Sequence, residues 1–207
     1  MFRDTNPHLD SEGNLIFQSA TPGYPWTFKL AKYDRNGDLI QTICKIEYER
    51  DPDKIEVYSP NNIYYTVLES NHVVWPVTKP YELSVVDESG HLIKNIQKKY
   101  VPAKVTKEDM DMFNERYKDS GMKISIPEHY PPIRSISSDD EGRIFVNRYE
   151  TDPENRLYDV FDPEGKFISE LVVKDHLTFW KDKKLYSVAE DPNGYRYITR
   201  YKVIWNY

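Results

Sequence analysis

The chain reads KYDRNGDLIQTI at residues 32–43, and the same phrase returns as VVDESGHLIKNI at 85–96 and as VFDPEGKFISEL at 160–171. Each copy has an apolar stretch that ends in Asp, two further residues, a Gly, and then a polar residue before two apolar ones. The Asp side chain can accept hydrogen bonds from the turn backbone, and the Gly supplies the positive φ that closes a bulged hairpin loop. Each copy therefore predicts two antiparallel strands joined by a tight turn.

Periodicity alone leaves the second half of the phrase open between helix and strand. Leu39, Ile40 and Ile43 also fit the spacing of one helical face. The composition favours strands, because the chain has 17 Tyr and 14% aromatic residues, and aromatic side chains suit half-buried pleated surfaces. Together with the turn in front of these residues, the composition decides for a strand.

A second phrase stands about two dozen residues before the first one. It reads DSEGNLIF at 10–17 and DDEGRIFV at 139–146, with weaker copies in SPNNIYYT at 59–66 and KDKKLYSV at 181–188, where Asn62 or Lys183 replaces the Gly. The two phrases together give a unit of strand, turn, strand, loop, strand, turn, strand. A four-stranded meander of about 40–50 residues has the size of a propeller blade.

The predicted fold class is therefore all-β: a β-propeller-like array of about four four-stranded antiparallel blades in a single domain. The blades fall roughly at residues 1–50, 51–98, 133–174 and 175–207. Between the second and third blades, residues 99–132 form an insertion that predicts one short helix, with Thr106 as its N-cap. Its apolar stripe is Met110, Phe113 and Tyr117, and Gly121 is positioned to end it.

These turns resemble those of the six-bladed β-propellers of the NHL and TolB-like type. The matching segments are Asp10 to Phe17, Asp34 to Ile40, Asp87 to Ile93, Asp139 to Val146 and Asp162 to Ile168. The resemblance implies a propeller fold, and it implies scaffolds, ligand binders and a minority of hydrolases as functions. This chain departs from the pattern because it has about four blades, and its fourth unit lacks the last hairpin phrase. We therefore expect an open ring whose free blade edges invite self-association.

Composition and charge argue against several classes of protein. The net charge of −6 gives no basic surface for nucleic acid, and no stretch approaches the roughly 18 apolar residues of a membrane span. The amino terminus MFRDTNPHLD has no apolar core of a signal peptide, so the sequence as written predicts a soluble, unsecreted chain. The single Cys44 excludes an intrachain disulfide and leaves the compartment open.

No pattern in the sequence predicts a metal or cofactor. The five histidines lack metal-ligand spacing, and no nucleophile elbow, phosphate-binding loop or dinucleotide fingerprint is present. The acidic turns at 34–38 and 139–142 offer oxygens that suit calcium, but neither continues as an EF-hand loop, and turn chemistry explains them better. We expect no cofactor, with calcium as the alternative.

Candidate ligand-binding residues come from two loops and from the inner strands. Tyr24 and Trp26 lie in TPGYPWTF at 21–28, and Trp75 lies in SNHVVWPVTKPY at 70–81; both segments are expected between the second and third strands of their blades, on one side of the disc. Inner-strand residues expected to converge at the channel mouth are His8, Asp10, Arg134 and Asp139.

The sequence therefore favours a non-catalytic binding or protein-interaction module for a protein, small-molecule or carbohydrate ligand. The alternative is a metal-dependent hydrolase or lactonase with its site at the mouth of the central channel. A third interpretation makes the chain the carboxy-terminal part of a larger propeller.

Overall fold

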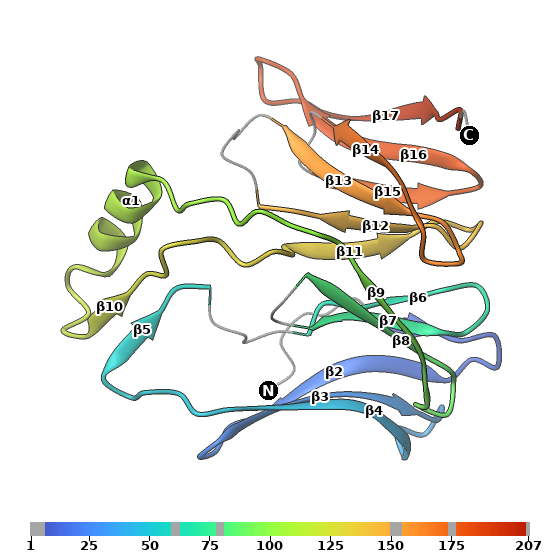
Figure 1. The fold of residues 1–207 in the computed structure, drawn as a ribbon, viewed down its shortest axis with the longest axis horizontal. Coiled ribbons are helices and arrows are strands. Elements are labelled where there is room, and N and C mark those ends of the chain that lie inside the picture. The colour runs from blue at the N-terminus through green and yellow to red at the C-terminus, as the bar shows by residue number, and fades with distance from the viewer. Residues whose placement is uncertain (1–6, 59–62, 78–80, 150–154, 174–176, 206–207) are drawn as a thin grey trace.

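The computed structural model describes residues 7–58, 63–77, 81–149, 155–173 and 177–205 (Figure 1). Its strands form four antiparallel sheets, each built from consecutive strands, and one parallel pair. We number the four sheets as blades one to four in chain order. Blade one contains β1 (His8–Leu9), β2 (Leu15–Thr21), β3 (Trp26–Tyr33) and β4 (Leu39–Tyr48).

Blades two to four repeat this order of strands. Blade two contains β6 (Thr66–Val67), β7 (Val73–Val77), β8 (Glu82–Val86) and β9 (Leu92–Gln97). Blade three contains β11 (Ser135–Ser138), β12 (Ile144–Asn147), β13 (Arg156–Phe161) and β14 (Phe167–Val173). Blade four contains β15 (Leu177–Lys181), β16 (Lys184–Glu190) and β17 (Arg196–Lys202). As the sequence predicts, its last hairpin strand is missing from the described residues.

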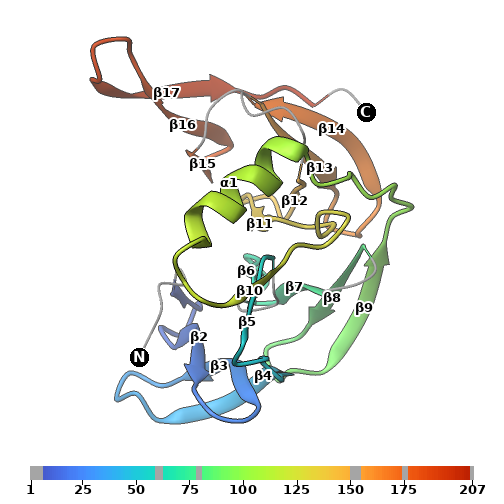
Figure 2. The same cartoon turned by 90° about the vertical axis from the view of Figure 1, so that its left-hand side faces the viewer.

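The blades lie one after another along an open arc, with blade one at one end and blade four at the other (Figure 2). Each sheet is a meander whose first strand is innermost, which is the topology of a propeller blade. Within the described residues, β17 pairs with β16 alone and β1 with β2 alone. The fold is thus a partial β-propeller, as predicted, and this part of the chain does not close a ring.

The repeated Asp turns have the hydrogen bonds that the sequence predicts. In the turn at Asp34, the carboxylate Oδ1 accepts from the backbone N–H groups of Asn36 and Asp38 at 2.8 and 2.9 Å, and Gly37 has a φ of 88°. Two main-chain hydrogen bonds also close each turn: the N–H of the Asp donates to the carbonyl four residues later, and the N–H of the Gly donates to the carbonyl of the Asp. Both bonds occur in the turns that begin at Asp10, Asp87, Asp139, Asp162 and Asp191. Only a Gly adopts this φ without strain, so each Asp-x-x-Gly phrase specifies one hairpin turn.

The first turn of blade two is not where the sequence analysis placed it. The weak phrase SPNNIYYT at 59–66 was expected to hold it, but β6 begins only at Thr66, and residues 59–62 lie outside the described residues. The turn is formed by residues 68–72, where the N–H of Leu68 donates to the carbonyl of His72 and Asn71 has a φ of 62°. Leu68 stands where the other turns have Asp, and Asn71 stands where they have Gly. The Asp-x-x-Gly pattern therefore does not identify this turn in the sequence.

In the part of the chain that the structure describes, the core has three apolar clusters, one between each pair of neighbouring blades. Phe28 and Leu30 belong to the cluster between blades one and two, and Leu83 and Ile144 to the one between blades two and three. The third cluster joins blades three and four through Phe145, Tyr158, Val160, Val173 and Leu185. Each blade therefore depends on its neighbours to bury its faces.

The insertion lies on one face of the arc, opposite the face that holds the Asp turns, and the loop between β2 and β3 lies on the same face (Figure 1). It contains α1 (Lys107–Tyr117) and β10 (Lys123–Ser125), and β10 pairs in parallel with β5 (Lys54–Glu56). The sequence analysis did not predict this parallel pair. The helix is confirmed, but Gly121 does not end it, because the C-cap is Lys118. Of the predicted stripe, only Phe113 is buried.

No helix in the described part of the chain is long and apolar enough to cross a membrane.

We expect the Thr106→Ala variant to lose about 1 kcal/mol of helix stability. Thr106 is extended, as an N-cap should be, and its Oγ1 accepts a hydrogen bond from the Asp109 N–H at 3.1 Å. The measurement is amide hydrogen exchange over residues 107–113. Thr106→Ser keeps the hydroxyl and should exchange like the natural protein; equal protection in all three proteins would contradict the cap.

Candidate ligand-binding site

Three tyrosines from distant segments gather beneath α1. Tyr58 follows β5, Tyr130 follows β10, and Tyr149 follows β12. The Tyr58 ring meets the Tyr130 and Tyr149 rings edge-on, with centroids 5.4 and 5.1 Å apart, and the last two rings are parallel at 5.4 Å. We call these three residues the tyrosine cluster. Phe113 of α1 also packs edge-on against Tyr58, at 5.5 Å, so the helix covers one side of the cluster.

The insertion holds the tyrosine cluster in place through hydrogen bonds. The Tyr130 hydroxyl donates to the Asp109 carboxylate on the first turn of α1, and it accepts from the Thr106 N–H at 3.3 Å. Tyr58 itself has a φ of 61°, an uncommon conformation for a bulky residue. Such backbone persists only where the surrounding contacts fix it, and the ring contacts of Tyr58 supply that support.

Arg134, at the start of β11, is the cationic residue of this site. Its guanidinium carbon lies 5.6 Å from the centroid of the Tyr149 ring, within the range of a cation–π contact. Its backbone N–H donates to the Asn147 carbonyl at 2.8 Å, which fixes it at the edge of blade three. The side chain is half-buried, and within the described residues its guanidinium makes no hydrogen bond and no ion pair.

Burial raises the pKa of two tyrosine hydroxyls of this site further above the physiological pH range. It raises the pKa of Tyr149 to about 12, and the neighbouring Tyr64 hydroxyl adds to that shift while the charge of Arg134 opposes it. Burial also raises the pKa of Tyr58, assisted by the negative charge of Asp109. Both hydroxyls are therefore hydrogen-bond donors throughout the physiological pH range.

Tyr24 and Trp26, predicted as a recognition loop, lie between β2 and β3 as expected. Tyr24 is 76% exposed, whereas Trp26 is the first residue of β3 and packs partly on the core between blades one and two. Its cross-strand neighbour Tyr48 donates a hydrogen bond to the Glu56 carboxylate of β5. This loop is thus linked through β5 to the segment that carries Tyr58.

The position predicted for Trp75 is wrong. It was expected in a loop between the second and third strands, but it lies in the middle of β7 and pairs across the sheet with Ser84. The shifted first turn of blade two explains the error, because the strand begins right after that turn. Trp75 is half-buried against the core between blades one and two, so little of it is free for recognition.

The predicted convergence of His8, Asp10, Arg134 and Asp139 is also wrong. Arg134 precedes the four-residue strand β11 and Asp139 follows it, so about 16 Å of extended chain separates them. Asp10 and Asp139 are buried turn residues, ion-paired with Lys32 at 2.7 Å and with Arg143 at 2.9 Å. These carboxylates hold hairpin turns. His8 packs edge-on against the Tyr65 ring at 5.5 Å.

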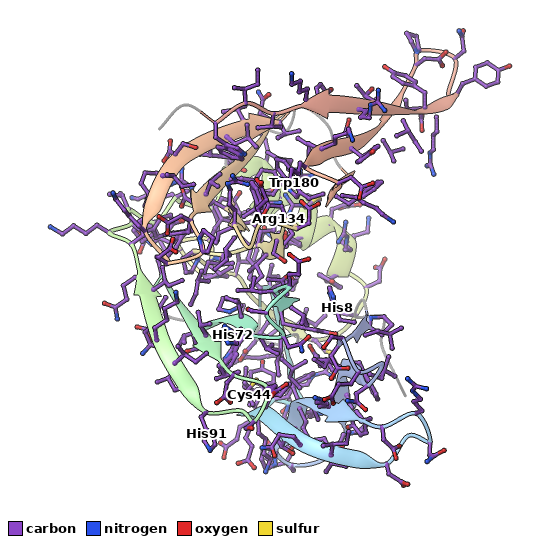
Figure 3. All side chains as sticks on the ribbon, turned by 90° about the vertical axis from the view of Figure 1, so that its right-hand side faces the viewer. His8, Cys44, His72, His91, Arg134 and Trp180 are labelled. Atoms are coloured by element: carbon purple, nitrogen blue, oxygen red, sulfur yellow. The ribbon has the colours of Figure 1, made fainter. Side chains whose placement is uncertain are left out.

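The described residues contain no group of three or more His, Cys, Asp or Glu side chains that could hold a metal ion. The histidines labelled in Figure 3 do not form one group: His91 is on the outer rim of the arc, away from His8 and His72. His176 lies outside the described residues.

Sequence reasoning had named part of this site. Of this site, Arg134 alone was predicted as a ligand-binding residue; Tyr149 was not, and neither were Tyr58 and Tyr130, which follow β5 and β10. The only signal available was the Tyr-rich composition, since nothing in the sequence indicates that β5 and β10 pair.

Comparisons with known proteins show a likeness of fold. No family model matches the chain, and no curated protein matches it. Matched solved structures include a DUF4221 family member from Bacteroides vulgatus, with 12% identity over 94% of this chain and 68% of that one and a TM-score of 0.46. The β-propeller domain of the Trilobed protease from Pyrococcus furiosus, of open velcro topology, has 12% identity, 93% and 58% coverage and a TM-score of 0.38.

A third match is virginiamycin B lyase from Staphylococcus aureus, with 10% identity over 97% of this chain and 70% of that one and a TM-score of 0.37. With two further matches included, the chain spans between 54% and 70% of the length of the solved protein. At these identities the likeness concerns the fold alone.

Proposed function

We propose that this chain is a non-catalytic binding module, and that its ligand, a carbohydrate or a protein segment, binds at the tyrosine cluster. The observation that carries the proposal is the meeting of three half-buried or buried tyrosine rings and Arg134 from separate segments on one face of the arc. Tyrosine and arginine dominate the energetics of binding surfaces, because they combine apolar area with hydrogen-bond donors. We propose further that the blades are of the NHL or TolB-like type, on the strength of their Asp-x-x-Gly turns.

The exposure of the site supports this function. Tyr64, which contributes to the raised pKa of Tyr149, is exposed. Tyr58 and Tyr149 both keep part of their surface accessible. Loops and insertions that project from a rigid scaffold are common recognition sites, and here the scaffold is the row of packed blades. Of the residues named for the hydrolase alternative, Asp10 and Asp139 hold hairpin turns with their carboxylates.

The test is calorimetric titration of the full chain with a panel of oligosaccharides and unstructured peptides. We expect at least one class to bind, and we expect Tyr149→Ala to weaken that binding by about tenfold or more, because the variant loses a central aromatic contact. The matched control is Tyr186→Ala on blade four, which removes a half-buried tyrosine stacked on Phe179 at 5.0 Å. This control should leave the affinity unchanged.

Three results would contradict the proposal. Conversion of a bound compound into a product would make the chain an enzyme. Binding that depends on Tyr186 and not on Tyr149 would move the site to blade four. Failure of every member of the panel to bind would exclude both proposed classes of ligand.

A further inference from the structure

Arg134 differs from Arg143 and Arg148 of the same blade in the kind of group that its guanidinium contacts. Arg143 is 2.9 Å from the Asp139 carboxylate, and Arg148 is 3.4 Å from the carboxylate of Asp159. Arg134, by contrast, has an aromatic ring as its neighbour and no carboxylate partner among the described residues. A half-buried charge without a partner is unfavourable, so this guanidinium is available to an incoming anion.

The groups near Arg134 include two hydrogen-bond donors, the hydroxyl of Tyr149, whose ring it contacts, and that of Tyr58, whose ring packs on Tyr149. The hydroxyls of Tyr58 and Tyr149 make no hydrogen bond to any described residue, and the charge of Arg134 acts on both. The nearest acidic group that acts on Tyr58 is Asp109 of α1, and its carboxylate already accepts from the Tyr130 hydroxyl. The site thus offers a fork of guanidinium N–H groups and two hydroxyls to a ligand that supplies acceptors.

We propose that Arg134, with the hydroxyls of Tyr58 and Tyr149, binds an anionic oxygen group of the ligand, either a carboxylate or a phosphate. The planar guanidinium matches both groups with two parallel hydrogen bonds, and such charge-assisted bonds are about twice as strong as neutral ones. The Tyr149 ring, with its centroid 5.6 Å from the guanidinium carbon, provides an aromatic face beside the fork. This inference rests on the proposed binding function and names the chemistry of its ligand.

The experiment titrates the full chain with inorganic phosphate and, separately, with D-galacturonate, while sodium chloride serves as the ionic-strength control. Two-dimensional NMR follows the arginine Nε–Hε signals. We expect a saturable shift of the Arg134 signal with at least one of the two anions, and the preferred anion distinguishes phosphate from carboxylate. Arg134→Gln should weaken the binding by at least about tenfold, and Arg134→Lys should bind with intermediate affinity, because lysine lacks the fork.

Two controls make the result specific. Arg196→Gln removes an exposed arginine on blade four that pairs with Glu190, and it should bind the anion as the natural protein does. Thermal unfolding should show that Arg134→Gln is no less stable than the natural protein without anion, and that the anion raises the melting temperature of the natural protein alone. Unchanged binding by Arg134→Gln, or shifts that chloride reproduces, would overturn the inference.

The two proposals fail in different ways. A ligand that is lost in Tyr149→Ala but retained in Arg134→Gln would leave the binding function intact and remove the anion site. Anion binding that depends on Arg134, without any ligand from the panel, would keep the anion site and exclude the proposed ligand classes.

Discussion

Replacement of Asp159 by alanine should destabilise the protein by about 3–5 kcal/mol, because it removes the buried counter-charge of two partly buried cations and leaves them only the exposed Glu170. Asp159 lies on β13 and is completely buried. Its carboxylate accepts from the Tyr81 hydroxyl of blade two at 2.6 Å and from the Lys98 ammonium at 2.5 Å, and Arg148 is 3.4 Å away. These contacts join blades two and three in one polar network inside an otherwise apolar core.

The control for this variant is Glu170→Gln. Glu170 contacts the same two cations, Lys98 and Arg148, both at 3.3 Å, but its side chain is largely exposed. Exposed ion pairs contribute little, so we expect a loss of less than about 1 kcal/mol. Urea unfolding followed by circular dichroism gives both values. If Asp159→Ala lost no more than Glu170→Gln, the network would have no role in joining the blades.

The fold could be predicted from the sequence wherever a turn is encoded locally. The Asp-x-x-Gly phrases contain both the side-chain acceptor and the residue with positive φ, so they specify hairpins without any distant contact. Blade three shows this: its strands were expected near 133–138, 143–149, 157–161 and 166–173, and they lie at 135–138, 144–147, 156–161 and 167–173. Where Leu68 and Asn71 replace the Asp and the Gly, the prediction failed.

The candidate site was harder to predict, because it depends on contacts between distant segments. Tyr58 and Tyr130 are 72 residues apart in the sequence and meet through the β5–β10 pair, for which the short strands give no pattern. The predicted inner-strand set failed for a related reason. Asp10 and Asp139 were expected at the channel mouth as inner-strand residues, but their carboxylates accept hydrogen bonds within hairpin turns. Self-association through open blade edges stays a prediction.

The final prediction concerns blade four, which ends the arc (Figure 2) and packs on blade three through one cluster of described residues. Phe145 is completely buried in this cluster, stacked on Trp180 at 4.2 Å and 6.1 Å from Trp205. Phe145→Ala should therefore cost about 3–5 kcal/mol. Because blade four packs on blade three alone among the described blades, the loss should appear as local opening, with amide exchange in β16 at least about a hundredfold faster.

Phe28→Ala is the matched control, since Phe28 is a buried phenylalanine of the core between blades one and two. It should cost a similar free energy but speed exchange in blade one and leave β16 protected. Hydrogen exchange measured by mass spectrometry on both variants separates the two patterns. If Phe145→Ala accelerated exchange equally in all four blades, the arc would unfold as one cooperative unit. In a chain of blades that depend on neighbour contacts, the end blade should instead open first, because it has one interface to lose where an internal blade has two.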